Sequence, residues 1–488
     1  MTDVDAVVVG AGPNGLAGAV LLARAGLRVH VVEEQPTPGG GARSVDDWVV
    51  PGIRHDLCSA VHPMALASPF FRGFDLAARG VRMRTPEVSY AQPLDGGRAG
   101  LAFRDLDRTV DALGPDGAAW RDLFAPLVRH ADDVVAFLMG DHRHLPPHLL
   151  TAVRFGLRAL EQGLGATWDR RFRTSEAPAL LSGVAAHAIT PLPSIAAAGT
   201  SLMLGTLAHA TGWSVPEGGT QVITDALLAD LDAHGATLET GRRVTALDEL
   251  PAAHAYLLDT APGAAARILG ERVPPRMSRA MRRFRHGDAA AKVDLVLGGP
   301  VPWRNPDVGR AGTVHVGGTR AEMAAAEHAV HAGRHAEHPM VLVSDPAVSD
   351  PGRAGAAGRR PLWTYAHVPA GSDVDMTEAV VARIERYAPG FRDVVVDARA
   401  IPASRLSAHD SAYVGGDIAG GALSLRRVLS GPALQRDPYA TGVPGAYLCS
   451  ASVPPGPGVH GMGGWHAARR ALVERFGIRE LPSLAPGA

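Results

Sequence analysis

The stretch that decides the fold runs from Asp5 to Gly15 and reads Asp-Ala-Val-Val-Val-Gly-Ala-Gly-Pro-Asn-Gly. A short apolar strand leads directly into the pattern Gly-x-Gly-x-x-Gly, and a helical apolar periodicity follows it. Gly10 permits a tight turn, Gly12 lets the backbone approach a pyrophosphate, and Gly15 lets the helix pack against the strand. The first N–H groups of that helix would face the phosphates. We therefore predict a βαβ unit that binds a dinucleotide.

The second strand of this unit supports the same prediction. Residues 28–32 are strand-like and end in Glu33, close to the expected spacing of about 20 residues from the glycine loop. A carboxylate at this point accepts hydrogen bonds from ribose hydroxyls and repels a 2′-phosphate. A second glycine-rich loop follows, Pro-Gly-Gly-Gly-Ala-Arg at 38–43. We expect it to contact another part of the dinucleotide.

Composition excludes several classes of function. The chain has 488 residues and a net charge of −1, without a basic tail, which argues against nucleic acid as a partner. Its two cysteines, Cys58 and Cys449, form no Cys-x-x-Cys motif, so neither a redox-active disulfide nor a structural zinc site is predicted. The first strand starts almost at once, without a signal peptide, and no apolar run reaches about 18 residues. These features predict a cytoplasmic protein.

Among 48 basic residues the sequence contains a single lysine, Lys292. It lies on a predicted strand, residues 291–297, where it shares a face with Asp294. Lysine differs from arginine because it is compact and can lose its proton when buried. A surface or salt-bridged lysine would explain the pattern equally well, so Lys292 is a candidate rather than an assignment.

The rest of the chain divides into helical and strand-rich regions. Residues 149–164 show an amphipathic helical period, and residues 194–210 are almost wholly apolar or small. These two stretches predict either a packed helical subdomain or an apolar channel or membrane-dipping lid. We further expect a helix at 222–234, strands at 243–247, 255–259 and 362–368, loops and a helix over 310–360, and a last helix at 465–476. We recognise no second Gly-x-Gly-x-x-Gly in a strand–helix context, so no separate nicotinamide domain is expected.

Three blocks of sequence resemble a known family. Residues 7–43, 213–244 and 447–468, with His55-Asp56 and the stretch 59–63, are similar to FAD-dependent oxidoreductases related to phytoene desaturase and carotenoid isomerase. The resemblance is nearest to the bacterial branch described as phytoene dehydrogenase-related or pyridine nucleotide-disulfide oxidoreductase domain 2-like. The family usually has Gly-Gly-Arg-x-Arg after the second strand, whereas here Gly41 replaces the first arginine and Arg43 keeps the second.

The resemblance implies an α/β fold with two domains. A discontinuous, Rossmann-like FAD-binding domain of the glutathione-reductase type would comprise residues 1–75, 212–288 and 425–488. The substrate domain would comprise residues 76–211 and 289–424, with a mixed or antiparallel sheet and capping helices.

The resemblance also implies a set of FAD contacts. The first loop would hold the pyrophosphate, Glu33 and its neighbour the adenosine ribose, the second loop the ribityl–phosphate side, and Val244 the adenine. Gly461 and Met462, at the start of the last helix, would donate N–H groups to the pyrimidine end of the flavin; Ser450 or the backbone near Ala451 would contact the ribityl chain. The full expected set is Gly10, Gly12, Pro13, Asn14, Gly15, Glu33, Glu34, Gly40, Gly41, Ala42, Arg43, Val244, Ser450, Ala451, Gly461 and Met462.

Catalytic and substrate-contacting residues are fewer. Lys292 is the first catalytic candidate, because flavin amine oxidases of this broader fold look similar there, with a lysine that holds a water near flavin N5. His460 and His466 flank the last helix start and are candidate bases. The candidate substrate contacts are His62, Tyr365, His367 and Trp465. No metal site is predicted.

These observations favour an FAD-dependent desaturase, dehydrogenase or oxidase. It would remove a hydride from a C–H or C–N bond of a small, apolar substrate or biosynthetic intermediate, with oxygen or a quinone as electron acceptor. Three alternatives stay open: redox-neutral polyene isomerisation by reduced FAD, amine oxidation, and non-catalytic binding of a lipid or prenyl group. The oligomeric state and peripheral contact with a membrane are also open.

Overall fold

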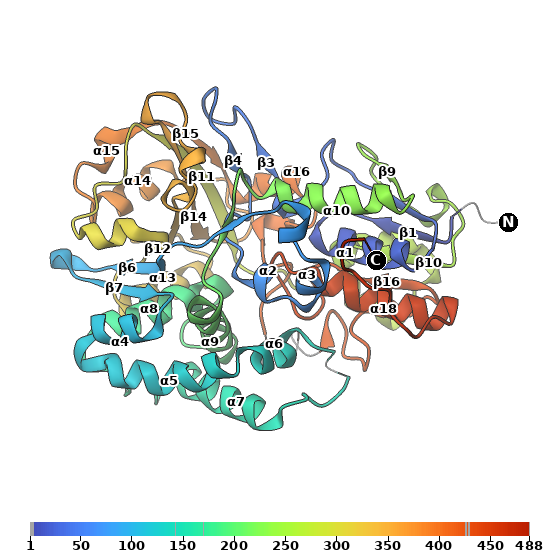
Figure 1. Ribbon diagram of the computed structural model, residues 1–488, viewed down its shortest axis with the longest axis horizontal. Helices are drawn as coiled ribbons and strands as arrows, with labels where there is room; N and C mark the ends of the chain where they lie inside the picture. The colour runs from blue at the N-terminus through green and yellow to red at the C-terminus, as the bar shows by residue number, and fades with distance from the viewer. Residues whose placement is uncertain (1–3, 142, 169, 425–426, 428–429, 488) are drawn as a thin grey trace.

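Two β-sheets organise the chain in a computed structural model that describes residues 4–141, 143–168, 170–424, 427 and 430–487. The smaller sheet and its helices lie at one end of an elongated molecule, and the larger sheet lies at the other (Figure 1). Both termini lie at the end that holds the smaller sheet (Figure 1). The predicted α/β fold is confirmed, with one parallel and one mixed sheet.

The smaller sheet is parallel and is assembled from the start, middle and end of the chain. Four of its strands are short and almost wholly buried, as expected for a sheet with helices on its faces, whereas the edge strand at residues 237–239 is largely exposed. Each strand lies within one of the three segments predicted to form the dinucleotide-binding domain. In spatial order they are β16 (Ala446–Leu448), β10 (Ala255–Leu258), β1 (Ala6–Val9), β2 (Val29–Val32) and β9 (Thr237–Glu239).

Helices α1 (Pro13–Arg24) and α18 (Met462–Phe476) pack closely against each other beside this sheet. Glycine at two positions makes the approach possible. A Cβ on Gly464 would lie 1.7 Å from the Asn14 carbonyl oxygen, and one on Gly18 would lie 2.7 Å from Leu257. The last helix of the chain is therefore held against the first. A third helix, α10 (Gln221–Ala233), also packs on α1 and matches the helix predicted at 222–234.

The strand predicted at 243–247 is wrong. The edge position beside β2 is taken by β9, a few residues earlier in the chain. The chain then turns at Gly241, which has φ of +71°, and Arg242 N–H donates to the Glu33 carbonyl. Residues 241–246 consequently lie over the ends of the strands instead of extending the sheet.

The larger sheet is mixed: β12 and β6 are parallel, and the other neighbours are antiparallel. Two of its strands fall in the region 310–360, where only loops and a helix were expected. Alanine and glycine in this region mask the alternation of apolar and polar residues by which strands are predicted. In spatial order the strands are β15 (Val395–Ile401), β11 (Ala289–Leu297), β14 (Arg360–Val368), β13 (Val341–Ser344), β12 (Ala311–Val316), β6 (Val88–Pro93) and β7 (Ala99–Phe103).

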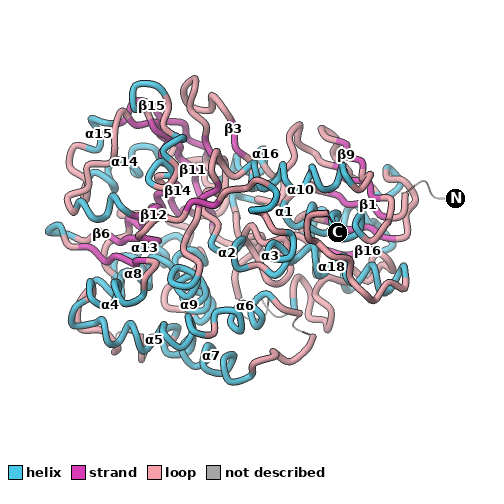
Figure 2. The backbone as a smooth tube through the Cα atoms, in the orientation of Figure 1, coloured by secondary structure: helices cyan, strands magenta, loops and turns pink. Residues whose placement is uncertain are grey.

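A group of helices lies together on one side of this sheet, and α14 (Thr377–Glu385) and α15 (Phe391–Val394) lie on the other (Figure 2). The apolar α9 is mostly buried and packs on α5, α7 and α8. This arrangement confirms the predicted helical subdomain. The helices of the group are α4 (Leu106–Ala112), α5 (Gly117–Arg129), α6 (Ala131–Met139), α7 (Leu149–Gly163), α8 (Glu176–Ala185) and α9 (Ile195–Ala210).

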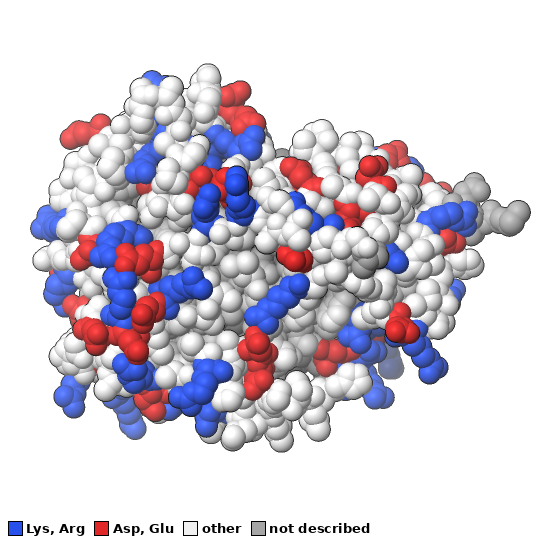
Figure 3. Space-filling view, in the orientation of Figure 1, with Lys and Arg blue, Asp and Glu red and all other residues white. Residues whose placement is uncertain are grey.

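Helix α7 turns its leucines outward. Its buried face includes Ala152, Phe155 and Ala159. Leu150 and Leu157, by contrast, are 72% and 61% exposed. Figure 3 shows uncharged surface at the lower edge of the molecule, where α7 lies in Figure 1. The predicted helix is confirmed, but its apolar stripe is not part of the core. Within the described ranges, no helix is both long and apolar enough to cross a membrane.

Candidate functional site

A single large cavity of about 1470 Å³ connects the two sheets. It exceeds the roughly 300–1,000 Å³ of a typical small-molecule pocket. At one end it meets the carboxyl ends of β1, β2 and β10 through Val9, Val32 and Asp259; at the other it meets β11 and β14. Ligands of open α/β sheets bind at the carboxyl ends of the strands. The cavity can therefore hold a dinucleotide at one end and a second molecule at the other.

The glycine loop forms the first end of the cavity, and Gly10, Gly12, Pro13 and Asn14 line it. Gly10 has φ of +98°, and a Cβ there would lie 2.6 Å from the Asp259 carbonyl oxygen. Gly15 lies behind the loop, where a Cβ would be 2.1 Å from the Gly10 carbonyl oxygen. The glycines therefore keep their own side chains out of the space at the start of α1, where helix N–H groups favour an anion.

Glu33 lies at the end of β2, where the sequence predicted a ribose contact. Its Oε2 accepts from the Ala11 N–H at 2.6 Å and its Oε1 from the Gln35 N–H at 2.8 Å. Burial raises the pKa of this carboxyl. Glu34 and Val244 also line the cavity, and Glu34 is 3.4 Å from Arg243. These residues surround the space beyond the strand ends, in accord with an adenosine half.

Asp259 was missed as a site residue, although the sequence placed it at the end of a strand. Its side chain lies beneath the glycine loop, where Oδ2 accepts from the Gly15 N–H at 2.8 Å. Burial raises the pKa of Asp259 to about 8, so the carboxyl is mainly protonated at neutral pH. A neutral carboxyl at this point does not repel a pyrophosphate.

The second glycine loop only partly matches its prediction. Gly40 and Gly41 line the cavity, but Ala42 and Arg43 are buried behind them. The Arg43 guanidinium donates to the Gly40 carbonyl at 3.0 Å and to the backbone carbonyl of His409, so it braces the loop instead of facing a ribityl–phosphate chain.

The missing arginine of the family pattern has a structural reason at Gly41. A Cβ on Gly41 would lie 2.2 Å from Oη of Tyr413. Tyr413 comes from a segment far along the chain and occupies the space that a larger residue would need. Tyr413, with Asp410 from the same segment, also lines the cavity.

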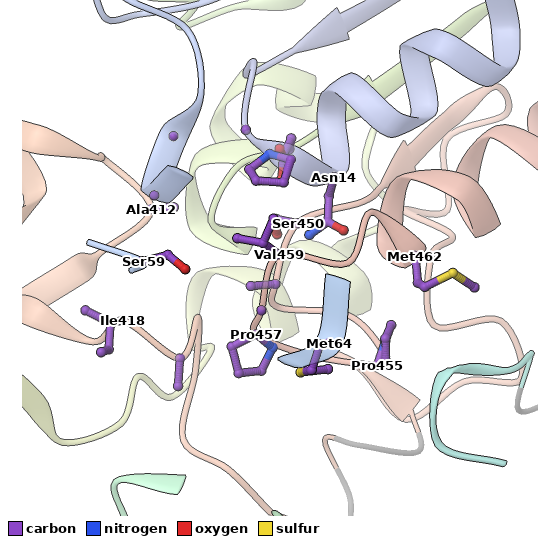
Figure 4. A pocket seen from close by; sticks show the side chains of 18 of the residues that line it. Asn14, Ser59, Met64, Ala412, Ile418, Ser450, Pro455, Pro457, Val459 and Met462 are labelled. Carbon is purple, nitrogen blue, oxygen red and sulfur yellow. The ribbon is translucent and has the colours of Figure 1, made fainter. Parts of the chain in front are cut away.

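The C-terminal part of the site contains Ser450, Ala451 and Met462, all of which line the cavity. Figure 4 shows Ser450 and Met462 with Asn14 from the start of α1. Gly461 has φ of +69° and precedes α18 directly. The Met462 N–H donates to Nδ1 of His460 at 3.0 Å, so in this structure it already has an acceptor.

Neither histidine of this region fits the role of a catalytic base. His460 is fully buried outside the cavity lining, and its Nε2 donates to the Gly456 carbonyl at 3.1 Å. His466 lines the cavity, but its Nε2 donates to the Met139 carbonyl at 2.9 Å. Burial lowers the pKa of His460 to about 4 and that of His466 to about 3. Both are therefore mainly neutral at neutral pH, and Nδ1 of His466 has no hydrogen-bond partner among the described residues.

The substrate candidates fall into two groups. His62, Tyr365 and Trp465 line the cavity, and Nε2 of His62 lies 3.0 Å from Oγ1 of Thr220. His367 stacks on Tyr365 as expected from their shared strand face, but it lies behind the cavity wall. There its Nδ1 pairs with Glu327 at 2.6 Å. In this structure His367 does not face the ligand space, and its role as a substrate contact stays a prediction.

Lys292 lies at the boundary between the two halves of the cavity. It is 3% exposed, lines the cavity from β11, and its Nζ lies 4.9 Å from the centre of the Trp363 ring. The ammonium group donates to Asp294, which also accepts from Nε1 of Trp48 at 3.1 Å. Burial lowers the pKa of Lys292, and the Asp294 carboxylate acts in the opposite direction. The single lysine is thus buried and next to the ligand space.

The walls beyond Lys292 are mostly apolar. The residues that form them come from β11, β13, the segment 61–64 and the helical layer, and they include Val61, Met64, Ala188, Ile195, Met203, Leu204, Ala290 and Leu342. Across the described ranges, no cluster of three His, Cys, Asp or Glu side chains could hold a metal ion.

The site as a whole fits a dinucleotide cofactor. The glycine cradle that a Cβ would fill and the strand-end carboxylate at Glu33 suit a pyrophosphate and a ribose, and the cavity continues past Met462 to Lys292. A bound dinucleotide would be held by Gly10, Gly12, Glu33 and Gly40.

Comparisons with known proteins agree with this fold. Residues 8–72 match the NAD(P)-binding Rossmann-like domain. An uncharacterized protein of Mycobacterium tuberculosis is 27% identical, over 98% of this chain and 99% of its own length. Pyridine nucleotide-disulfide oxidoreductase domain-containing protein 2 of Rattus norvegicus is 24% identical over 96% of this chain and 93% of its own. A solved structure of a putrescine oxidase variant superposes with a TM-score of 0.62 at 18% identity, covering 97% and 99% of the two chains.

Proposed function

We propose that this protein is an FAD-dependent oxidoreductase that removes a hydride from a C–H bond of a small, apolar substrate. The observation that carries the proposal is the continuous cavity, which leads from the glycine loop to Lys292 and then into an apolar space. The relatives and the matched oxidase fold support the same class of reaction. When bound, FAD supplies the hydride acceptor.

The chain's own residues bind the cofactor, orient the substrate and shield the reacting carbon from water. The N-terminus of α1 holds the pyrophosphate, and Glu33 holds the ribose. Apolar walls such as Leu204 and Leu342 exclude water from the reacting carbon. Lys292 Nζ holds a proton next to the ligand space and exchanges it with Asp294 or with a water in the cavity. Oxygen or a quinone takes the electrons afterwards, because the sequence shows no second Gly-x-Gly-x-x-Gly loop that directly joins a strand to a helix.

The charges on the walls favour an uncharged substrate over a cationic amine. Five acidic residues line the cavity. Three of them belong to the nucleotide half. Asp141 is paired with Arg143 and Arg470, and Asp410 lies beside Gly40. Asp410 makes no ion pair among the described residues, but it lies beside Gly40 in the nucleotide half and not in the apolar half. C–N oxidation of an amine is therefore the second candidate, supported by the likeness to putrescine oxidase.

The test starts from the purified protein. We expect it to carry FAD and to lose its oxidised-flavin absorption when mixed anaerobically with an apolar substrate, with recovery when oxygen or a quinone is added. Peroxide release from a panel of amines would favour amine oxidation. Isomerisation only after prior reduction of the flavin would favour a redox-neutral isomerase. A colourless protein that does not take up FAD would overturn the proposal and leave lipid or prenyl binding.

A further inference from the structure

The apolar half of the cavity ends in a small group of polar side chains, His187, His315 and Thr313, which we call the distal pole. His187 belongs to the short helix η5 (Ala186–Ala188), and the other two lie on β12. His187 and Thr313 line the cavity, and His315 supports His187 from behind. The nucleotide half of the site does not contact this group.

The two histidines form a neutral pair. Nε2 of His187 lies 2.8 Å from Nε2 of His315, so one ring donates and the other accepts. Edge-on contacts with Trp213, at 5.5 Å and 5.9 Å between ring centres, hold both rings in place. Burial lowers the pKa of each, that of His187 to about 3. Since the pair can adopt either tautomeric arrangement, Nδ1 of His187 can donate or accept a hydrogen bond.

Polar atoms at the distal pole lack partners. Oγ1 of Thr313 and Nδ1 of His315 are buried and make no hydrogen bond within the described residues. Thr313 is 1% exposed and His315 is fully buried. Buried polar groups are almost always paired in folded proteins, and unpaired ones need an explanation such as a ligand or a water. Thr313 lines the cavity, so its unpaired hydroxyl lies at the cavity wall.

The strand register sets the distance from the distal pole to Lys292. Lys292 pairs with Tyr365, Tyr365 with Leu342, and Leu342 with His315. These four residues form one row across neighbouring strands and share one face of the sheet. Three strand spacings of about 4.8 Å place the distal pole about 14 Å from Lys292.

We propose that the distal pole binds an uncharged hydroxyl or carbonyl group of the substrate, at about 14 Å from Lys292. The substrate class is then a linear, apolar chain with a neutral polar end, held by His187 and Thr313 with that end away from the flavin. A carboxylate or phosphate end is disfavoured because no cationic side chain belongs to the pole. This assignment rests on the proposed function and narrows its substrate class.

Calorimetric titration of the holoenzyme with two probes tests the assignment. Decanol carries a terminal hydroxyl, and fluorodecane has the same length without one. We expect the wild type to bind decanol about tenfold more tightly, the usual effect of one well-formed hydrogen bond in a buried site. His187→Phe and Thr313→Val should each reduce this preference to less than about threefold. Thr313→Val removes a hydroxyl that has no protein partner, so it keeps the fold.

The matched control is His144→Phe, the same change at an exposed histidine that also lines the cavity. It should keep the full preference for decanol. Equal binding of the two probes by the wild type, or an unchanged preference in both distal-pole variants, would overturn the assignment. Calorimetry needs no turnover, so a protein that never reduces its flavin but prefers decanol would contradict the proposed function alone.

Discussion

Replacing Asp259 with asparagine should change how the stability of the protein depends on pH. The Asp259 carboxyl is fully buried under the glycine loop, and its pKa is raised from an ordinary value of 3.8 to about 8. A carboxyl whose pKa is raised by folding stabilises the folded state most at low pH, and the stability is lost as the pH rises through the folded-state pKa. Asparagine keeps the acceptor for the Gly15 N–H but cannot ionise.

The magnitude follows from the size of the pKa shift. Between about pH 4 and pH 8 the unfolded chain releases a proton that the folded chain retains. The free energy of unfolding therefore falls by about 1.4 kcal/mol per pH unit from this group alone. From pH 5 to pH 7 the D259N variant should gain about 3 kcal/mol relative to the wild type. Above pH 8 the wild type should also bind FAD more weakly, because an ionised carboxyl repels the pyrophosphate.

Urea denaturation of the flavin-free wild type and D259N, at half-unit steps of pH, measures this effect. Asp345→Asn is the matched control, because burial raises the pKa of Asp345 only to about 6. The gain in the free energy of unfolding of Asp345→Asn over the wild type should stop near pH 6, whereas the gain of D259N continues to about pH 8. Parallel stability curves for D259N and the wild type would refute the reasoning, because they would mean that Asp259 is ionised in the folded protein.

Three further predictions concern the lysine, the helix contact and the exposed helix. Lys292→Met should keep FAD bound but slow turnover or flavin reoxidation at least tenfold in stopped-flow measurements, and unchanged steady-state kinetics would exclude a role at the site. Gly464→Ala should lower the flavin content and the melting temperature, because its Cβ would meet the Asn14 carbonyl at 1.7 Å, whereas Gly156→Ala, with no atom within 4 Å, should change neither. Leu157→Glu should leave folding intact and reduce co-sedimentation with phospholipid vesicles if the outward face of α7 contacts a membrane; sedimentation equal to that of the wild type would count against membrane contact.

Much of the nucleotide half could be predicted from local sequence. A glycine loop between a strand and a helix needs only a few consecutive residues to specify its geometry. Positions such as Gly10 have a positive φ that strongly favours glycine. Glu33 could be placed by its spacing alone. Asp259 and Tyr413 could not, because each acts through a neighbour far away in the chain: Gly15 for the first and Gly41 for the second. No local pattern carries such pairings.

The histidines show the same difference between what local sequence predicts and what tertiary contacts decide. His460 and His466 were candidate bases and His367 a candidate substrate contact, but all three are buried and bonded to backbone or carboxylate partners. The apolar stripe of α7 predicted a helix correctly and a buried face wrongly, because periodicity reports which residues share a face and not what covers that face.

By itself, then, the sequence determined the dinucleotide-binding βαβ unit, the helices and most strands, since these depend on turn chemistry and periodicity over a few residues. Only the tertiary structure decided that the first and last helices meet, that the sole lysine borders the ligand space, and that His187 and Thr313 close its far end. Those facts depend on strand register and on packing between segments hundreds of residues apart. They cannot be predicted from the pattern of neighbouring residues in the sequence.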